Sequence, residues 1–206
     1  MVKDINATAA NAASNPDLQY PAVLGGYLYF AANDGVNGAE LWRTDGTAAG
    51  TTLFKDINTA ASASSSPTAF SVHGATLYFR ANDGVTGIEP WLSDGTPAGT
   101  QLVKDITPSG SSSPADWVSV GSRVCFVATT GSTGTGMELY VTDGTAAGTS
   151  LVKDIRAGPL DGQPQWLTPL SATRFVFAAQ DDFTTGAGRE LWISDGTAAG
   201  TKLVAD

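Results

Sequence analysis

The sequence predicts an all-β protein, a β-propeller of four blades with four strands each, because one motif recurs four times at nearly equal spacing. The motif reads Glu-Leu-Trp, two further residues and Asp-Gly-Thr. Its aspartate recurs after 49 residues, after another 49 and then after 52, a period typical of an array of small sheets. No segment shows a sustained apolar period of 3.6 residues, so we expect almost no helix.

Each repeat is expected to contribute four short strands in the same order. The first strands are predicted at residues 20–24, 69–72, 117–120 and 166–170, and the second strands at 27–32, 76–81, 123–128 and 174–179. The third strands carry the Glu-Leu-Trp words and the fourth strands the Leu-Val-Lys-Asp words. Two-residue turns between the first and second strands are predicted at Gly25-Gly26, His73-Gly74, Gly121-Ser122 and Ser171-Ala172.

The second strands are apolar on both faces. In copy two, Leu77 and Phe79 point to one side of the strand and Tyr78 to the other. A strand covered on both sides is typical of a propeller blade between two neighbours, whereas a sandwich strand would show one polar face. Cys125 falls in the same strand of copy three, so we predict a core residue, and a single cysteine excludes an intrachain disulfide.

Residues 1–206 are predicted to form a single propeller domain, with repeats at about 6–57, 58–106, 107–155 and 156–206. Segments like a fourth strand occur at residues 2–5, 53–57, 102–106, 151–155 and 203–206. A ring of four blades needs four of them, so we expect a terminal strand to close the ring and one end to be surplus. An unpaired strand at a sheet edge readily joins chains, which predicts head-to-tail or edge-strand association with a second copy. A chain cut from a longer array is the competing explanation.

The repeated words resemble the bacterial ELWxxDGT repeat family over essentially the whole chain. Copies two and three depart from the motif with Pro90 and Tyr140. The family occurs in large secreted or surface proteins, so the resemblance implies a propeller-like fold and an extracellular or cell-surface location, and it implies no agreed activity. The first residues show no charged segment followed by an apolar one, so no signal peptide is visible and we expect a mature or excised chain.

Composition argues against several classes of partner. The formal net charge of -9 and the pI near 4.4 disfavour nucleic acid and anionic membrane surfaces, which bind clustered Lys and Arg. No stretch is long and apolar enough for membrane insertion. The only histidine, His73, is expected to be a solvated turn residue, so no catalytic triad is predicted around it.

The Asp-Gly-Thr words are predicted to form self-contained structural loops. Their aspartates are Asp45, Asp94, Asp143 and Asp195. Each carboxylate can accept hydrogen bonds from the amides of the loop that it begins, while the glycines allow unusual backbone angles and the threonine hydroxyls bond to the backbone. The loops faintly resemble the Asp-box of sialidase propellers, which is structural, so this resemblance argues against glycosidase activity.

Two loops between the second and third strands carry Asn-Asp-Gly, which predicts Asx-type turns. The alternative is a calcium site made by Asp34 with Glu40, and by Asp83 with Glu89, because carboxylates are suitable hard ligands. The spacing differs from that of an EF-hand, and copy three lacks the aspartate. We therefore expect no cofactor and keep calcium as the alternative.

Thirteen of the 20 acidic residues occupy three repeated positions, and repeated positions share one environment. A catalytic acid and base need different environments, so we predict no enzyme. The motif aromatics are predicted in the blade cores, with stacking on sugar faces as the alternative; they are Trp42, Trp91, Tyr140 and Trp192. Two functions remain open: an extracellular structural, adhesive or self-assembling module, and a multivalent lectin-like binder of glycans.

Overall fold

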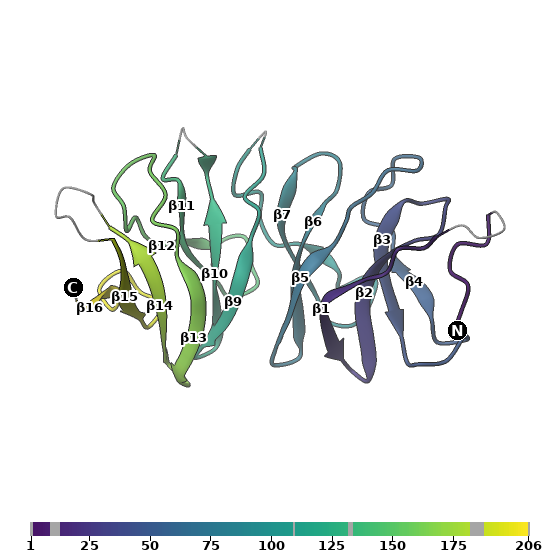
Figure 1. Cartoon of the computed structure of the whole chain (residues 1–206), viewed down its shortest axis with the longest axis horizontal. Helices are drawn as coiled ribbons and strands as arrows, with labels where there is room; N and C mark the ends of the chain where they lie inside the picture. The colour runs from purple at the N-terminus through teal and green to yellow at the C-terminus, as the bar shows by residue number, and fades with distance from the viewer. Residues whose placement is uncertain (1, 9–12, 109, 132–133, 182–187, 206) are drawn as a thin grey trace. The chain divides into compact units, whose positions relative to one another are not determined.

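The computed structural model describes residues 2–8, 13–108, 110–131, 134–181 and 188–205. Within these residues the chain forms four antiparallel four-stranded sheets and no α-helix, as predicted (Figure 1). The chain divides into two compact units, residues 1–102 and 103–206. In the described ranges, no helix is long and apolar enough to cross a membrane.

The first unit contains two sheets, with strand orders β1-β2-β3-β4 and β5-β6-β7-β8. The strands of the first sheet are β1 (Asp17–Leu24), β2 (Tyr27–Asn33), β3 (Ala39–Thr44) and β4 (Thr52–Lys55). Those of the second sheet are β5 (Thr68–His73), β6 (Thr76–Asn82), β7 (Ile88–Ser93) and β8 (Gln101–Leu102). Each sheet is a meander, because strands adjacent in the sequence are adjacent in the sheet.

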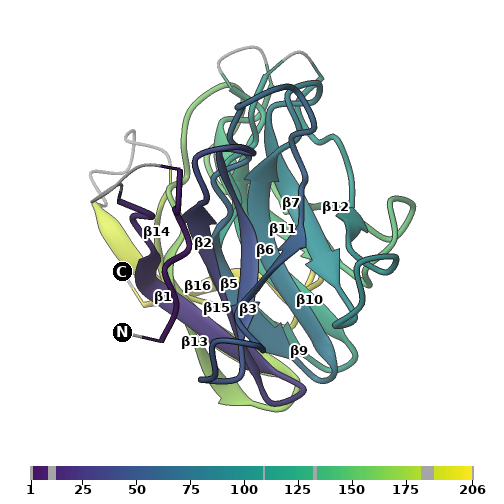
Figure 2. The ribbon, with the colours of Figure 1, turned by 90° about the vertical axis from the view of Figure 1, so that its right-hand side faces the viewer.

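The second unit repeats this plan with the strand orders β9-β10-β11-β12 and β13-β14-β15-β16. The strands of the third sheet are β9 (Ala115–Val120), β10 (Arg123–Thr129), β11 (Met137–Thr142) and β12 (Ser150–Lys153). Those of the fourth sheet are β13 (Gln165–Ser171), β14 (Arg174–Gln180), β15 (Arg189–Ser194) and β16 (Lys202–Ala205). Figure 2 shows the same ribbon turned by 90°.

Two of the four turns between first and second strands lie one residue later than predicted. His73 pairs with Thr76, so the turn of copy two consists of the residues between them, Gly74 and Ala75. In copy four, Ser171 pairs with Arg174. Gly74 has a φ of 62°, which glycine adopts without the steric penalty of other residues, and this fixes the turn after the histidine.

His73 is therefore the last residue of β5 and not a solvated turn residue. Its ring is partly buried, and its Nε2 lies 2.9 Å from the Ser71 hydroxyl. Burial lowers the pKa of His73, because it disfavours the charged imidazolium. The side chain belongs to the packing of the second sheet.

The central strands are buried on both faces, as their sequences predict. Tyr29 and Phe30 are neighbours in β2 and both are buried, although they point to opposite sides of the sheet. Tyr29 packs in one cluster with Phe79 of the second sheet. In the second unit, Cys125 packs in the corresponding cluster with Phe175 of the fourth sheet, which confirms it as a core residue.

The two ends of the chain are each held by their own unit. Strand β16 occupies the fourth position of the last sheet, where Leu203 pairs with Trp192. Residues 2–4 form no strand, but the Lys3 ammonium group donates a hydrogen bond of 2.7 Å to the Thr51 carbonyl, and Ile5 packs against the first sheet. Ring closure by a terminal strand and the single domain of residues 1–206 stay predictions.

Candidate functional site

The Asp-Gly-Thr loops follow the third strand of every sheet and close on themselves. In copy three, Asp143 Oδ1 accepts hydrogen bonds from the Thr145 amide at 2.9 Å and the Thr145 hydroxyl at 2.7 Å. The Thr145 hydroxyl in turn accepts the Gly148 amide at 3.0 Å. These bonds from Thr145, led by its hydroxyl, lower the pKa of Asp143, so the carboxylate is ionised at neutral pH.

The same loop occurs in all four copies. Asp45, Asp94 and Asp195 accept the matching pair of bonds from the threonine two residues later. The glycine five residues after each aspartate cannot be replaced by a residue with a side chain without a shift of the loop, because an added Cβ would overlap the aspartate carboxylate. The four aspartates thus make the hydrogen bonds that the predicted structural loops require; Asp45, Asp94 and Asp143 are exposed, and Asp195 is partly exposed.

The glutamate of the motif has a different role, which the sequence analysis did not identify. Glu40 is 0% exposed and reaches the linker that joins the first sheet to the second. Its Oε2 accepts the Ile57 amide at 2.8 Å and the Ser65 hydroxyl at 2.6 Å, and its Oε1 accepts the Ser65 amide at 2.8 Å. We call this arrangement, a third-strand glutamate with the linker that follows its sheet, a joint.

The second unit contains the same joint. Glu138 accepts the amide of Ile155 at 3.0 Å and that of Gly162 at 2.7 Å, and it is also 0% exposed. Burial raises the pKa of Glu138 to about 7 although the amides favour the ionised form, and burial raises the pKa of Glu40 as well. Glu89 is likewise fully buried. The two joints of Glu40 and Glu138 therefore connect the two sheets of each unit through a buried carboxyl group.

The candidate calcium ligands bond to different parts of the backbone and not to a common site. Asp34 Oδ1 accepts the amides of Val36 at 2.9 Å and Asn37 at 2.8 Å, and these bonds outweigh partial burial and lower its pKa. Asp83 Oδ1 makes the same Asx turn, because it accepts the amides of Val85 and Thr86 in its own loop. Glu40, the proposed calcium-binding partner of Asp34, instead accepts hydrogen bonds from the linker in the joint. Among the described residues, no three side chains of His, Cys, Asp or Glu form a group that could hold a metal ion.

The four motif aromatics lie in the cores and not on an open surface. Trp42, Trp91, Tyr140 and Trp192 are all buried. Each belongs to a cluster of buried hydrophobic residues, which agrees with the predicted place of these aromatics in the blade cores. Among the described side chains, Trp166 near the start of β13 is an exposed aromatic residue, at 69%.

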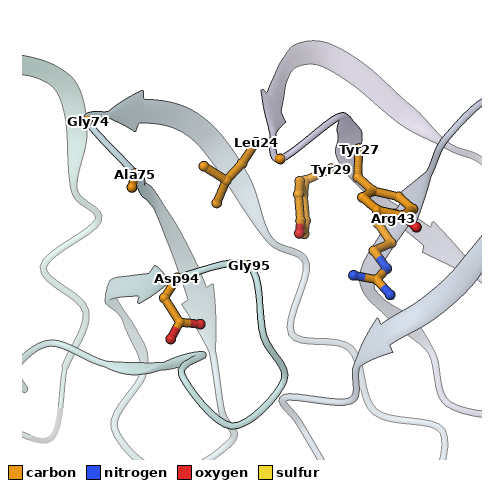
Figure 3. A pocket seen from close by; sticks show the side chains of 9 residues that line it. Leu24, Tyr27, Tyr29, Arg43, Gly74, Ala75, Asp94 and Gly95 are labelled. Carbon is orange, nitrogen blue, oxygen red and sulfur yellow. The ribbon is translucent and has the colours of Figure 1, made fainter.

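A pocket of about 470 Å³ lies within the first unit, between the first turn of each sheet and the loop of Asp94 (Figure 3). Arg43 lines it, and its guanidinium carbon lies 4.3 Å from the centre of the Tyr27 ring and 5.0 Å from that of Phe54. The matching residues of the other copies are Leu92, Val141 and Ile193. The sequence analysis did not identify this pocket; its available signal was a single cationic residue at a repeat position that is otherwise apolar.

No family model and no curated protein matches the sequence. Among solved structures, the chain is similar to a prolyl endopeptidase, with a TM-score of 0.52 and 16% identity over 87% of this chain and 24% of the other. It is also similar to a TolB protein from Agrobacterium tumefaciens, with a TM-score of 0.50 and 14% identity over 88% of this chain and 62% of the other. These are propeller-type folds, so the four sheets are propeller blades. At this identity the likeness shows the fold alone.

Proposed function

We propose that the chain is a non-enzymatic structural module that acts in adhesion or self-assembly, outside the cell or on its surface. The supporting observation is that its most regular chemical groups are used inside the fold. The Asp143 carboxylate, like its three counterparts, binds its own loop, and the Glu40 and Glu138 carboxylates bind the linkers between blades. Carboxylates that are bonded in this way stabilise the repeats and are not free to bind a ligand or substrate.

The geometry offers little support for acid-base catalysis. A catalytic carboxyl group must reach a substrate, whereas Glu40 and Glu138 are covered completely. Three loop aspartates are exposed and Asp195 is partly exposed, but the bonds from their own threonines lower the pKa values of all four, which makes them poor proton donors at neutral pH. The buried motif aromatics likewise give no specific support to the lectin-like alternative.

A melting experiment tests the proposal. The wild-type protein is melted with and without calcium and a panel of soluble oligosaccharides, together with Asp143→Asn, which keeps the acceptor oxygen and removes the charge. We expect no ligand-dependent shift of the melting temperature in either protein. A calcium or glycan shift in the wild type that Asp143→Asn loses would contradict the proposal, and so would hydrolysis of a glycoside or peptide substrate.

A further inference from the structure

The pocket of the first unit is lined by two polar groups that the fold itself leaves without a partner, the Arg43 guanidinium and the Tyr29 hydroxyl. All nine residues that line the pocket lie within residues 1–102, so its walls are complete within one unit. Its volume of about 470 Å³ falls in the range of roughly 300–1,000 Å³ that is typical of small-molecule sites. The pocket therefore has the size for a small organic molecule.

Arg43 is held in place by aromatic rings and not by hydrogen bonds. Its guanidinium carbon lies 4.3 Å from the centre of the Tyr27 ring and 5.0 Å from that of Phe54, which permits cation–π attraction to both. Its Nε is buried without an acceptor, and among the described residues no hydrogen bond to the guanidinium is found. Stacking fixes the plane of the terminal NH2 groups, and this is the geometry that a carboxylate needs to accept two hydrogen bonds.

The Tyr29 hydroxyl is the second polar group of the pocket. Its side chain is 1% exposed, and no hydrogen bond to the hydroxyl is found in the described part of the chain, although Tyr29 lines the pocket (Figure 3). A Cβ added at Gly95 would lie 3.7 Å from the hydroxyl oxygen, so this glycine leaves the oxygen uncovered on that side. A buried hydroxyl without a partner costs free energy, which a ligand acceptor would recover.

The three stacked side chains occur together only in copy one. Tyr27, Arg43 and Phe54 come from three different strands, β2, β3 and β4. The other copies have Val at the position of Phe54, Leu, Val or Ile at that of Arg43, and Thr or Arg at that of Tyr27. Because the other copies form their sheets without these three residues, their meeting at one pocket indicates a local role beyond the fold.

The matching space of the second unit is narrower. A Cβ added at Gly196 would meet three side chains at 3.0–3.4 Å, Arg123 among them, whereas at the matching Gly95 the nearest side chain, that of Leu24, is 3.6 Å away. Arg123 occupies the repeat position of Tyr27, and its side chain reaches the glycine that borders the pocket in the first unit. The wider space is thus a property of the first unit and not of the repeat.

Carboxylates beside the pocket limit the charge of a ligand. Asp94 lines the pocket, and bonds from Thr96 lower its pKa, so it is ionised at neutral pH. The Arg43 charge adds, after the bonds from Thr47, to the lowering of the pKa of Asp45, so a second carboxylate lies near the cation. A ligand with one negative charge can bind Arg43, whereas a phosphate or a dicarboxylate would be repelled by these aspartates.

We propose that this pocket binds a small organic monocarboxylate, whose carboxylate accepts hydrogen bonds from the Arg43 guanidinium and the Tyr29 hydroxyl. The apolar or aromatic body of the ligand packs against Leu24 and the Tyr27 ring, which line the same pocket (Figure 3). Asp94 keeps the bonds to its own loop and selects against further negative charge. This binding activity goes beyond the structural role proposed above and does not depend on it.

Isothermal titration calorimetry with phenylacetate tests the proposal, because this acid carries one carboxylate on a short arm from an apolar ring. The wild type should bind phenylacetate. It should bind phenylacetamide and inorganic phosphate at least about tenfold more weakly, because the amide lacks the charge and phosphate lacks the apolar body.

Arg43→Leu and Tyr29→Phe test the two groups separately. Phenylacetate binding should weaken by about tenfold or more in Arg43→Leu and by about threefold or more in Tyr29→Phe, because each loses hydrogen bonds to a charged acceptor. Leu92 occupies the position of Arg43 in copy two, so Arg43→Leu is compatible with the sheet. Arg174→Leu, which removes a cation at an exposed position of the second unit, is the matched control and should bind like the wild type.

Melting temperatures close to that of the wild type will show that the variants are folded. A wild type that binds no phenylacetate overturns the proposal, and so does phenylacetate binding that neither Arg43→Leu nor Tyr29→Phe weakens. Phosphate binding as tight as that of phenylacetate would also overturn it, because the pocket would then be a general anion site. The calcium, glycan and hydrolysis experiments are separate, so failure of this site can be told apart from failure of the non-enzymatic role.

Discussion

Glu138 should make the stability of the protein fall as the pH rises through the weakly acidic range. Burial raises its pKa from the ordinary value of 4.5 to about 7 in the folded chain. Between these two values the folded state binds more protons than the unfolded state, so the free energy of unfolding decreases with increasing pH. The contribution is fully present below pH 4.5 and is lost as the pH reaches about 7.

The size of this effect follows from the shift. One pKa unit corresponds to about 1.4 kcal/mol, so the raised pKa of Glu138 accounts for at most about 3 kcal/mol between the two ends of the range. Glu40 adds a decrease of the same sign, because burial raises its pKa too. The loop aspartates act in the opposite direction, but only at lower pH, because their pKa values lie below the ordinary 3.8.

Glu138→Gln isolates the effect, because glutamine has nearly the same shape and does not titrate. Urea unfolding followed by tryptophan fluorescence, at a series of pH values from 4.5 to 7, should give a shallower decrease for the variant than for the wild type. The variant should also lose about 1–3 kcal/mol of unfolding free energy. The NH2 group of glutamine would face a backbone N–H that donates to a carboxylate oxygen in the wild type.

Glu190→Gln is the matched control at the same repeat position. Glu190 is partly exposed whereas Glu138 is fully buried, so Glu190→Gln should keep the wild-type pH dependence. A Glu138→Gln protein with an unchanged slope, or a wild type whose stability increases from pH 4.5 to 7, would refute the burial argument.

Two further outcomes are expected. Gly148→Ala should lower the melting temperature, because the added Cβ overlaps the Asp143 carboxylate. Ala147→Gly, at an exposed neighbouring position, should have little effect. Equal melting temperatures of Gly148→Ala and the wild type would contradict this account of the loop. Burial raises the pKa of the Cys125 thiol to about 12, so a disulfide reagent such as dithionitrobenzoate should react with it at neutral pH only after unfolding, and rapid reaction with the folded chain would show that the third sheet opens.

The fold could be predicted because its signals are local and repeated four times. The apolar pairs of the second strands, such as Tyr29 with Phe30, predict two covered faces, and glycines mark the turn between the first and second strands in three of the four copies. The turn at Gly74 was misplaced because His73 and Ala75 are equally acceptable beside a glycine. Only the pairing of His73 with Thr76 decides between the two positions.

The joints could not be predicted, because the partners of the glutamates are backbone amides. Glu40 binds Ile57 and Ser65, which lie 17 and 25 residues later and whose side chains carry no charge that would mark them. A signal was nevertheless present. An ionisable residue between apolar neighbours in a strand covered on both faces must be buried, and a buried carboxyl group needs donors.

The joints also explain why the motif contains a glutamate in a strand that is otherwise apolar. Glu40 and Glu138 are each fully buried, and each accepts backbone amides of the linker that follows its sheet. A single repeat cannot supply both halves of a joint, because the hydrogen-bond donors lie in the segment that leads to the next repeat. The same carboxyl group therefore holds its own strand and the start of the following repeat, and its loss leaves buried amides without an acceptor.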